Sequence, residues 1–354
     1  MKSLRWLLIF FPIALVTELA HGNELIIFAA SALAIIPLAG VMSEATEVLA
    51  EKTGPRIGGL LNATLGNAAE LIITLFAIQA GLLELVRASI IGSILGNLLL
   101  VLGLSILAGG LKNGLQRFDR GHIGLDATLT ILAVIAISVP SIFNAAIEPD
   151  TTRVEELSLT TAAAMLIIYV LSIVYSLRSK HPEAIGAGPS IQPPHAGSRW
   201  STRQAAGVLA LATIGIVLMS EFLVGAVEPV TQVLGFSEFF VGIIIVPIIG
   251  NVAEHIVAVQ VAVKNQMALS LSIALGSSLQ IALFVAPVLV FISLLMGHPL
   301  TLEFNGYEMI SLTAAAAIAA FVSLDGESNW LEGAMLLVVY AIVALAFFFL
   351  PIKM

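Results

Sequence analysis

Apolar runs of about 20 residues follow one another along nearly the whole of this 354-residue chain, and runs of that length are typical of helices that cross a membrane. The sequence is 59% hydrophobic and only 11% charged, whereas soluble domains carry roughly 25% charged residues. No polar stretch is long enough to form an aqueous domain with a core of its own. The sequence therefore predicts an all-α, polytopic membrane protein.

The composition also excludes several classes of function. Because the chain contains no cysteine, it has no disulfide, no thiol nucleophile and no Cys-ligated metal. It has no basic tract typical of nucleic-acid binding, and neither an HExxH nor a GxSxG motif. We therefore expect no enzyme, no cofactor and no nucleic-acid partner. The lipid bilayer is the expected surrounding, and a homo-oligomer is compatible with the sequence.

Eleven apolar runs separated by polar breaks predict eleven spans. They lie near 4–20, 25–50, 56–80, 84–110, 122–147, 157–178, 203–228, 238–263, 268–297, 306–324 and 330–351. The first run follows Lys2 and Arg5, as the apolar part of a signal peptide would. Glu18, however, occupies the −3 position before a cut after Ala20, where a small residue is needed. We therefore expect this run to be retained as an extra span.

A Gly-, Pro- and Ser-rich stretch at 179–202 is the predicted linker, and its composition is typical of a flexible, solvated segment. Five spans lie on each side of it, after the extra first span. The predicted organisation is an N-terminal helix at 1–22, a five-helix repeat at 23–178, the linker at 179–202 and a second five-helix repeat at 203–354.

The distribution of Lys and Arg predicts the orientation in the membrane. With a cytoplasmic N-terminus, twelve of the 15 Lys and Arg residues fall on the cytoplasmic side, as the positive-inside rule requires. The other three are Arg87, Arg153 and Lys353. We therefore expect a cytoplasmic N-terminus and linker and an external C-terminus. The short chain suits a prokaryotic inner membrane, with an organelle as the alternative.

The phrase Gly-Asn-x-Ala-Glu occurs twice, at 66–70 and at 250–254, 184 residues apart. The same offset, without a gap, also pairs Gly92 with Gly276 and Ser93 with Ser277. Because each unit contains an odd number of spans, the second unit must lie upside down relative to the first. Inverted repeats of this kind are a transporter architecture, with the substrate site near the midplane.

Glu70 and Glu254 fall about midway along the third and eighth spans, so inverted symmetry brings them together. A lone ionised glutamate at that depth costs roughly 2.5–3.5 kcal/mol on insertion scales. Two protons or one divalent cation would each relieve this cost, and the two occupancies exclude each other. That competition is the basis of cation/proton exchange. The alternative is a protonated glutamate that makes one interhelical hydrogen bond.

Neutral oxygen ligands accompany the two acids. They are Asn67 in the third span, Ser93 and Asn97 in the fourth, and Ser277 and Gln280 in the ninth. Calcium takes six to eight oxygen ligands and accepts mixtures of carboxylates, amides and carbonyls. Gly66, Gly250 and Pro247 should break the third and eighth spans and free backbone carbonyls as further ligands. The sequence therefore predicts a site for a hard cation such as Ca²⁺.

Other intramembrane polar groups leave two interpretations open. Glu44 and Glu47 lie towards the end of the second span, and Glu221 and Glu228 lie in the seventh. These four acids either line ion pathways to the central pair or meet water at the span ends. His255 is either a proton partner of the site or a buried neutral histidine.

The segments "GPRIGGLLNATLGNAAELI", "GSILGN", "GIIIVPIIGNVAEHI" and "GSSLQIA" resemble the two alpha-repeats of the calcium/cation–proton exchangers (the CAX family of the cation/calcium exchanger superfamily), over nearly the whole chain. The resemblance implies that Glu70 and Glu254 bind the cation and exchange protons. It implies that the second and seventh spans move relative to a core of eight others, with the first span peripheral. It also places six neutral residues in or beside the site: Asn67, Asn251, Ser93, Ser277, Asn97 and Gln280.

The predicted linker departs from this family. Many members carry an acidic segment there that is thought to sense cytosolic calcium, whereas this linker contains a single acid, Glu183, beside His181 and His195. Regulation by that route is therefore not expected.

Taken with the residues, the resemblance predicts a secondary antiporter that exports cytosolic Ca²⁺ in exchange for H⁺ by alternating access. The alternatives within the same fold are a Na⁺-coupled Ca²⁺ exchanger and a monovalent cation/H⁺ antiporter. Sodium-coupled relatives show Ser/Thr-rich motifs around the acid, which disfavours the former. A cation channel built from rings of acids and carbonyls is the alternative of a different class.

Overall fold

The computed structural model describes residues 2–53, 58, 61, 64–147, 151–178 and 200–350. Within these residues, nine helical segments are long and apolar enough to cross a membrane, and they coincide with nine of the predicted spans. They are α2 (Glu24–Thr53), Leu83–Asn113, α7 (Arg120–Ile147), α8 (Thr151–Arg178), α9 (Thr202–Gly225), Glu238–Val263, Met267–Leu295, α15 (Gly306–Leu324) and α16 (Trp330–Phe348). The total of eleven spans stays a prediction.

The predicted first span is helical but changes type halfway. It begins as the 3₁₀-helix η1 (Lys2–Ile9) and continues as α1 (Phe10–Leu19). A 3₁₀-helix rises about 2.0 Å per residue and an α-helix about 1.5 Å. The two segments together therefore reach about 31 Å, close to the hydrocarbon thickness of a bilayer. The 3₁₀ geometry thus lets a short run cover the length of a membrane span.

The predicted third span contains α4 (Ala68–Gln79), which is apolar but only 12 residues long. Residues 64 and 65 are helical, and a turn at Gly66 and Asn67 separates them from α4. The predicted break in this span is therefore confirmed. Several residues of this span (56, 57, 59, 60, 62 and 63) and most of the predicted linker, 179–199, lie outside the described residues.

Three of the long helical segments contain π-helical turns, in which one residue more than usual fits into a turn. α5 (Leu83–Leu95) continues through η2 (Gly96–Val101) into α6 (Leu102–Asn113). α11 (Glu238–Phe240) continues through η3 (Val241–Ile245) into α12 (Val246–Val263). α13 (Met267–Gln280) continues through η4 (Ile281–Val285) into α14 (Ala286–Leu295). η2 and η4 fall at equivalent positions under the 184-residue offset.

The predicted break of the eighth span at Gly250 was wrong, because α12 runs without interruption through Gly250 and Asn251. The irregularity lies earlier, at η3, immediately before α12. Pro247 is the second residue of α12, and a proline in a regular helix would lack a donor and clash with the carbonyl four residues before it. The widened π turn accommodates Pro247, so the helix does not have to break.

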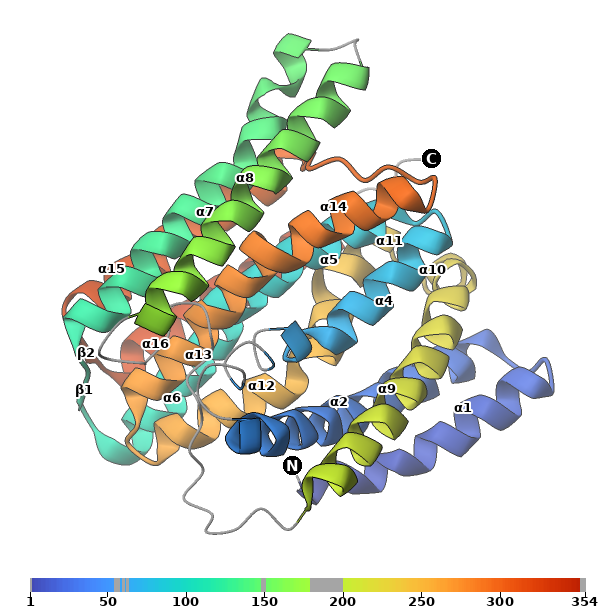
Figure 1. The fold of residues 1–354 in the computed structure, drawn as a ribbon, viewed down its shortest axis with the longest axis horizontal. Helices are drawn as coiled ribbons and strands as arrows, with labels where there is room; N and C mark the ends of the chain where they lie inside the picture. The colour runs from blue at the N-terminus through green and yellow to red at the C-terminus, as the bar shows by residue number, and fades with distance from the viewer. Residues whose placement is uncertain are drawn as a thin grey trace.

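The helices form two groups in space (Figure 1). α1, α2 and α9 lie together, and α2 packs more extensively against α9 than against any other described helix. The remaining long helices form the second group, in which α6 packs against α16 and α7 against α15. The groups meet where α9 contacts α4 and α2 contacts α12. The two helices that carry the repeated motif therefore line the boundary.

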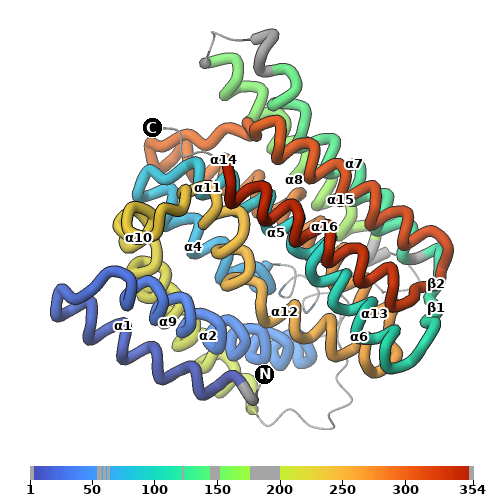
Figure 2. The backbone as a smooth tube through the Cα atoms, turned by 180° about the vertical axis from the view of Figure 1, so that it is seen from behind, coloured from blue at the N-terminus to red at the C-terminus, as the bar shows by residue number. Residues whose placement is uncertain are grey.

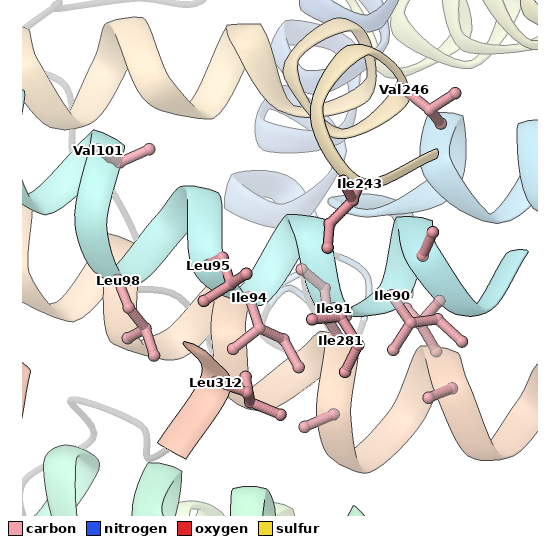
Figure 3. Close-up of a cluster of buried hydrophobic side chains, with 14 of the residues drawn as sticks. Ile90, Ile91, Ile94, Leu95, Leu98, Val101, Ile243, Val246, Ile281 and Leu312 are labelled. Atoms are coloured by element: carbon pink, nitrogen blue, oxygen red, sulfur yellow. The ribbon is translucent and has the colours of Figure 1, made fainter. Parts of the chain in front are cut away.

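The second group is held by a dense aliphatic core around α5 and η2 (Figure 3). Ile91, Ile94 and Leu98 are fully buried there. Glycines allow two backbones to touch at this place: a Cβ atom on Gly92 would overlap the carbonyl oxygen of Ile243, and one on Gly242 would lie 2.6 Å from the carbonyl oxygen of Leu85. α5 and η3 therefore pack at a distance that only glycine permits.

A two-stranded sheet joins loops of the two halves of the chain (Figure 2). β1 (Gln116–Arg117) pairs antiparallel with β2 (Glu327–Ser328). Arg117 also forms an ion pair with Glu327, with Nε and Oε1 3.3 Å apart. The sheet fixes the loop after α6 to the loop before α16.

The end of α6 and the residues that follow it cap the C-terminus of α12. The last carbonyls of a helix lack partners within the helix. Asn113 Nδ2 donates to the carbonyl oxygens of Ala262 and Val263, both at 3.3 Å. Gln116 Nε2 donates to the Ala262 carbonyl at 3.1 Å and to Asn265 Oδ1 at 3.0 Å. These hydrogen bonds from Asn113 and Gln116, here called the α12 cap, fix one end of the helix that carries Glu254.

Replacing Gln116 by Ala should lower the free energy of unfolding by about 1–3 kcal/mol, because two hydrogen bonds of a buried amide are lost and Ala262 keeps only the longer bond from Asn113. Thermal unfolding of the purified protein measures the change. Lys112→Ala is the control, because Lys112 is an exposed residue one position before the end of α6, next to the same loop. Equal melting temperatures for the two variants would show that the hydrogen bonds of Gln116 in the α12 cap add no stability.

Candidate functional site

Glu70 and the Gly-Asn of the second motif are packed against each other. Glu70 lies in the first turn of α4 and Glu254 in the middle of α12. A Cβ atom on Gly250 would lie 3.6 Å from Glu70 Cβ and 3.7 Å from its Cα. The two carboxylates are close enough for their charges to interact. The backbone of α12 thus approaches Glu70 closely at Gly250.

Glu70 is buried and held by neutral donors from both halves. The hydroxyl of Ser93 donates to its Oε1. Asn251 Nδ2 donates to Glu70 Oε2 at 3.4 Å and to Ser93 Oγ at 3.2 Å. Only 1% of Glu70 is exposed. The first acid is therefore ordered by a serine of its own half and an asparagine of the other.

The remaining predicted ligands form matching contacts across the halves. Asn67 Nδ2 donates to Gln280 Oε1 at 2.6 Å, and Asn97 Nδ2 donates to Ser277 Oγ at 3.0 Å. A side-chain hydrogen bond joins Ser277 to Glu254. All these neutral residues are buried. Four segments of the chain thus each contribute two polar residues three or four positions apart, and the structure brings all eight predicted site residues together.

Two oxygen atoms of this cluster are left without a hydrogen-bond partner among the described residues. They are Asn67 Oδ1 and Glu254 Oε2, and both atoms are inaccessible to water. Amide and carboxylate oxygens are the ligands that hard cations prefer. The described residues contain no cluster of three or more acidic or histidine side chains that is arranged to hold a metal. A cation here would therefore be held by two carboxylates and neutral oxygens.

The five candidate pathway residues differ in how far they are buried. Glu44 is half-buried and pairs with Arg5, with Oε2 and Nη2 2.7 Å apart, a contact that the sequence did not predict. Glu47 is half-buried one turn further along α2, whereas Glu221 and Glu228 are exposed. His255 is buried. Their assignment to ion pathways stays a prediction.

Two buried acids escaped the sequence analysis. Asp126 in α7 and Glu308 in α15 are each 3% exposed. Glu308 closes a capping box, in which Asn305 Oδ1 accepts from its backbone N–H and Glu308 Oε2 accepts from the N–H of Asn305. The Asn-x-x-Glu pattern is a known helix-start signal and identifies Glu308 as structural. No comparable pattern marks Asp126.

Comparison with known proteins gives consistent matches. The model of the family described as sodium/calcium exchanger protein matches residues 23–178 and 204–349. The Ca²⁺/H⁺ antiporter of Aphanothece halophytica is 43% identical over 98% of this chain and 96% of its own. The Ca²⁺/H⁺ antiporter ChaA of Bacillus subtilis is 41% identical, over 96% of each chain. The solved structure of native YfkE superposes with a TM-score of 0.86 at 39% identity, covering 98% of this chain and all of that one.

Proposed function

Since the chain belongs to the sodium/calcium exchanger protein family, we propose that it is an antiporter that moves Ca²⁺ out of the cytosol in exchange for protons. The observation that carries this proposal is the buried cluster in which Glu70 and Glu254 meet oxygens from both halves. The names of the relatives, which cover nearly the whole chain at 41–43% identity, support calcium as the cation and protons as the counter-ion.

Each half of the exchange corresponds to one occupancy of the site. When both glutamates are ionised, Ca²⁺ neutralises them and takes Asn67 Oδ1 and Glu254 Oε2, the cluster oxygens that have no other partner among the described residues. When both are protonated, the carboxyl groups are neutral and the cation has no counter-charge. An empty, doubly charged site is unfavourable in a membrane interior. The two fluxes are therefore coupled, because the site changes sides only when it is neutral.

The two groups of helices supply the moving parts of this proposal. α2 and α9 pack on each other and contact the motif helices, α2 against α12 and α9 against α4. A shift of this pair would close one route to the cluster and open the other. Eleven spans, two inverted five-helix repeats and a cytoplasmic N-terminus complete the proposal. Glu44, Glu47, Glu221, Glu228 and His255 are its candidate pathway residues.

Calcium uptake into proteoliposomes under an imposed pH gradient tests the proposed exchange. Uptake should follow the pH gradient and should be unchanged by a sodium gradient of the same size. Uptake that followed sodium would assign the coupling to that ion. Rapid uptake without proton movement would indicate a channel.

Asn251→Ala should weaken calcium binding about tenfold or more, because hydrogen bonds to a charged group contribute roughly 1.5–3 kcal/mol. Glu70 and Ser93 would both lose a donor from the opposite half. The apparent affinity is read from uptake against calcium concentration. Gln260→Ala is the matched control, since Gln260 is an exposed residue of the same helix. Unchanged affinity in Asn251→Ala would remove Asn251 from the site.

A further inference from the structure

An apolar groove lies between the N-terminal helix and α9. Its volume is about 390 Å³. Leu8, Phe11 and Pro12 form one wall, and Leu211 and Ile214 of α9 form the other. Leu211 is 71% exposed and Ile214 is 57% exposed, so the groove opens towards the outside of the molecule. It is therefore accessible from the surrounding membrane.

The floor of the groove depends on a glycine. A Cβ atom on Gly215 would lie 3.1 Å from both methyl groups of Leu38 and 3.6 Å from Phe11 Cε2. Any larger residue would fill this part of the groove. The lining contains no charged side chain, and nothing in it could satisfy the hydrogen bonds of water. An acyl chain has the shape and the polarity that such a groove accepts.

The end of the groove nearest the N-terminus of α9 carries a cation. Arg203 lies 11 residues before Ile214 and therefore points within about 20° of it around the helix. It lies about 12 Å below the level of Leu211 along the axis. Arg203 is exposed, and no ion pair joins it to an acid within the described part of the chain. A positive charge thus stands where the groove meets the membrane surface.

A second cation occupies the same end on α2. Lys52 lies 14 residues after Leu38, within about 40° of the same face, and its Nζ donates to the carbonyl oxygen of Trp200 at 3.0 Å. Two acids of this end of α2, Glu47 and Glu51, point about 140–180° away from Leu38. The third, Glu44, is ion-paired with Arg5 of η1, so its charge is already matched. The N-terminus of the chain and the start of α9 lie side by side in both views (Figures 1 and 2).

We propose that this groove binds one acyl chain of an anionic phospholipid, whose phosphate is held by Arg203 and Lys52. The apolar walls accept the acyl chain. Arg203 lies about 12 Å along the helix axis from Leu211, the first groove residue of α9, which places the cation at the headgroup end of a lipid whose acyl chain lies in the groove. Lipids with an anionic headgroup bind basic residues at the membrane surface. Zwitterionic lipids of the same chain length fit the groove but satisfy the two cations less well.

Native mass spectrometry of the purified full-length protein, titrated with dioleoyl phosphatidylglycerol or dioleoyl phosphatidylcholine, tests the site. One phosphatidylglycerol should bind at least five times more tightly than phosphatidylcholine. The double variant Arg203→Gln/Lys52→Gln should lose this preference and keep the weaker binding. Equal binding of the two lipids to the wild type would overturn the proposal.

Leu211→Trp should fill the groove and remove the tight phosphatidylglycerol site. Leu171→Trp is its control, because Leu171 is a 60% exposed residue of α8 outside the groove. Both variants are expected to elute from size-exclusion chromatography as the wild type does, since both side chains lie on the outside. Tight binding that survived Leu211→Trp would show that the lipid sits elsewhere. A change in oligomeric state in Leu211→Trp alone would show that a second copy of the chain covers the groove.

Discussion

Replacing Glu254 by Gln is expected to abolish proton-driven calcium uptake, with a loss of at least 100-fold. Glutamine has the shape of a protonated glutamate but can neither release a proton nor neutralise a divalent cation. Position 254 would then stay uncharged at every pH. The single carboxylate of Glu70 would not balance the two charges of Ca²⁺. Uptake into proteoliposomes under a pH gradient measures the loss. The variant should still fold, because it removes a half-buried charge and adds none.

Glu24→Gln is the matched control. Glu24 is an exposed acid in the first turn of α2, so the same chemical change there leaves the cluster intact. Uptake by this variant should equal that of the wild type. Proton-driven uptake that persisted in Glu254→Gln would remove Glu254 from the exchange, even if Glu24→Gln behaved as expected.

Gly92→Ala should have the largest effect on stability, on the order of 3 kcal/mol, because overpacking of this kind forces a backbone to move. The added methyl would overlap the carbonyl oxygen of Ile243 and lie 2.6 Å from its carbonyl carbon. Relief requires α5 and η3 to separate, which opens the aliphatic core beside them. The measurement is the melting temperature of the purified protein together with the fraction that elutes as a single species.

Gly96→Ala provides the comparison one helical turn away. A Cβ atom on Gly96 would have no other atom within 4 Å, so this variant should unfold at the wild-type temperature. The two glycines share a small-xxx-small spacing in the sequence, but only Gly92 contacts another backbone. If both variants unfolded at the same temperature, the close approach of α5 and η3 would not limit stability.

Much of the site followed from the sequence because its residues are repeated. Chance matches are common among apolar residues but rare among Gly, Asn, Glu and Ser, so the 184-residue offset identified Glu70, Glu254, Ser93 and Ser277. The structure brings these residues together with Asn67, Asn97, Asn251 and Gln280. The helix lengths followed equally well, since nine predicted spans correspond to long apolar helices.

What the sequence did not predict depends on contacts between distant segments. The pairing of Arg5 with Glu44 joins residues 39 apart along the chain, and no local pattern indicates it. The cross-half bonds from Asn67 to Gln280 and from Asn97 to Ser277 span 213 and 180 residues. The predicted break at Gly250 failed for a different reason, because the effect of Pro247 depends on the π turn before it.

The two copies of the Gly-Asn-x-Ala-Glu phrase adopt different backbones in one molecule. At 66–70 the chain turns before the helix begins, and at 250–254 the helix continues. The phrase is therefore compatible with two backbones, and the packing around it in each half decides which one forms. Equal sequence in the two repeats thus does not mean equal local structure. The two halves of the site present their asparagine and glutamate from different backbones, one from a helix start and one from a continuous helix.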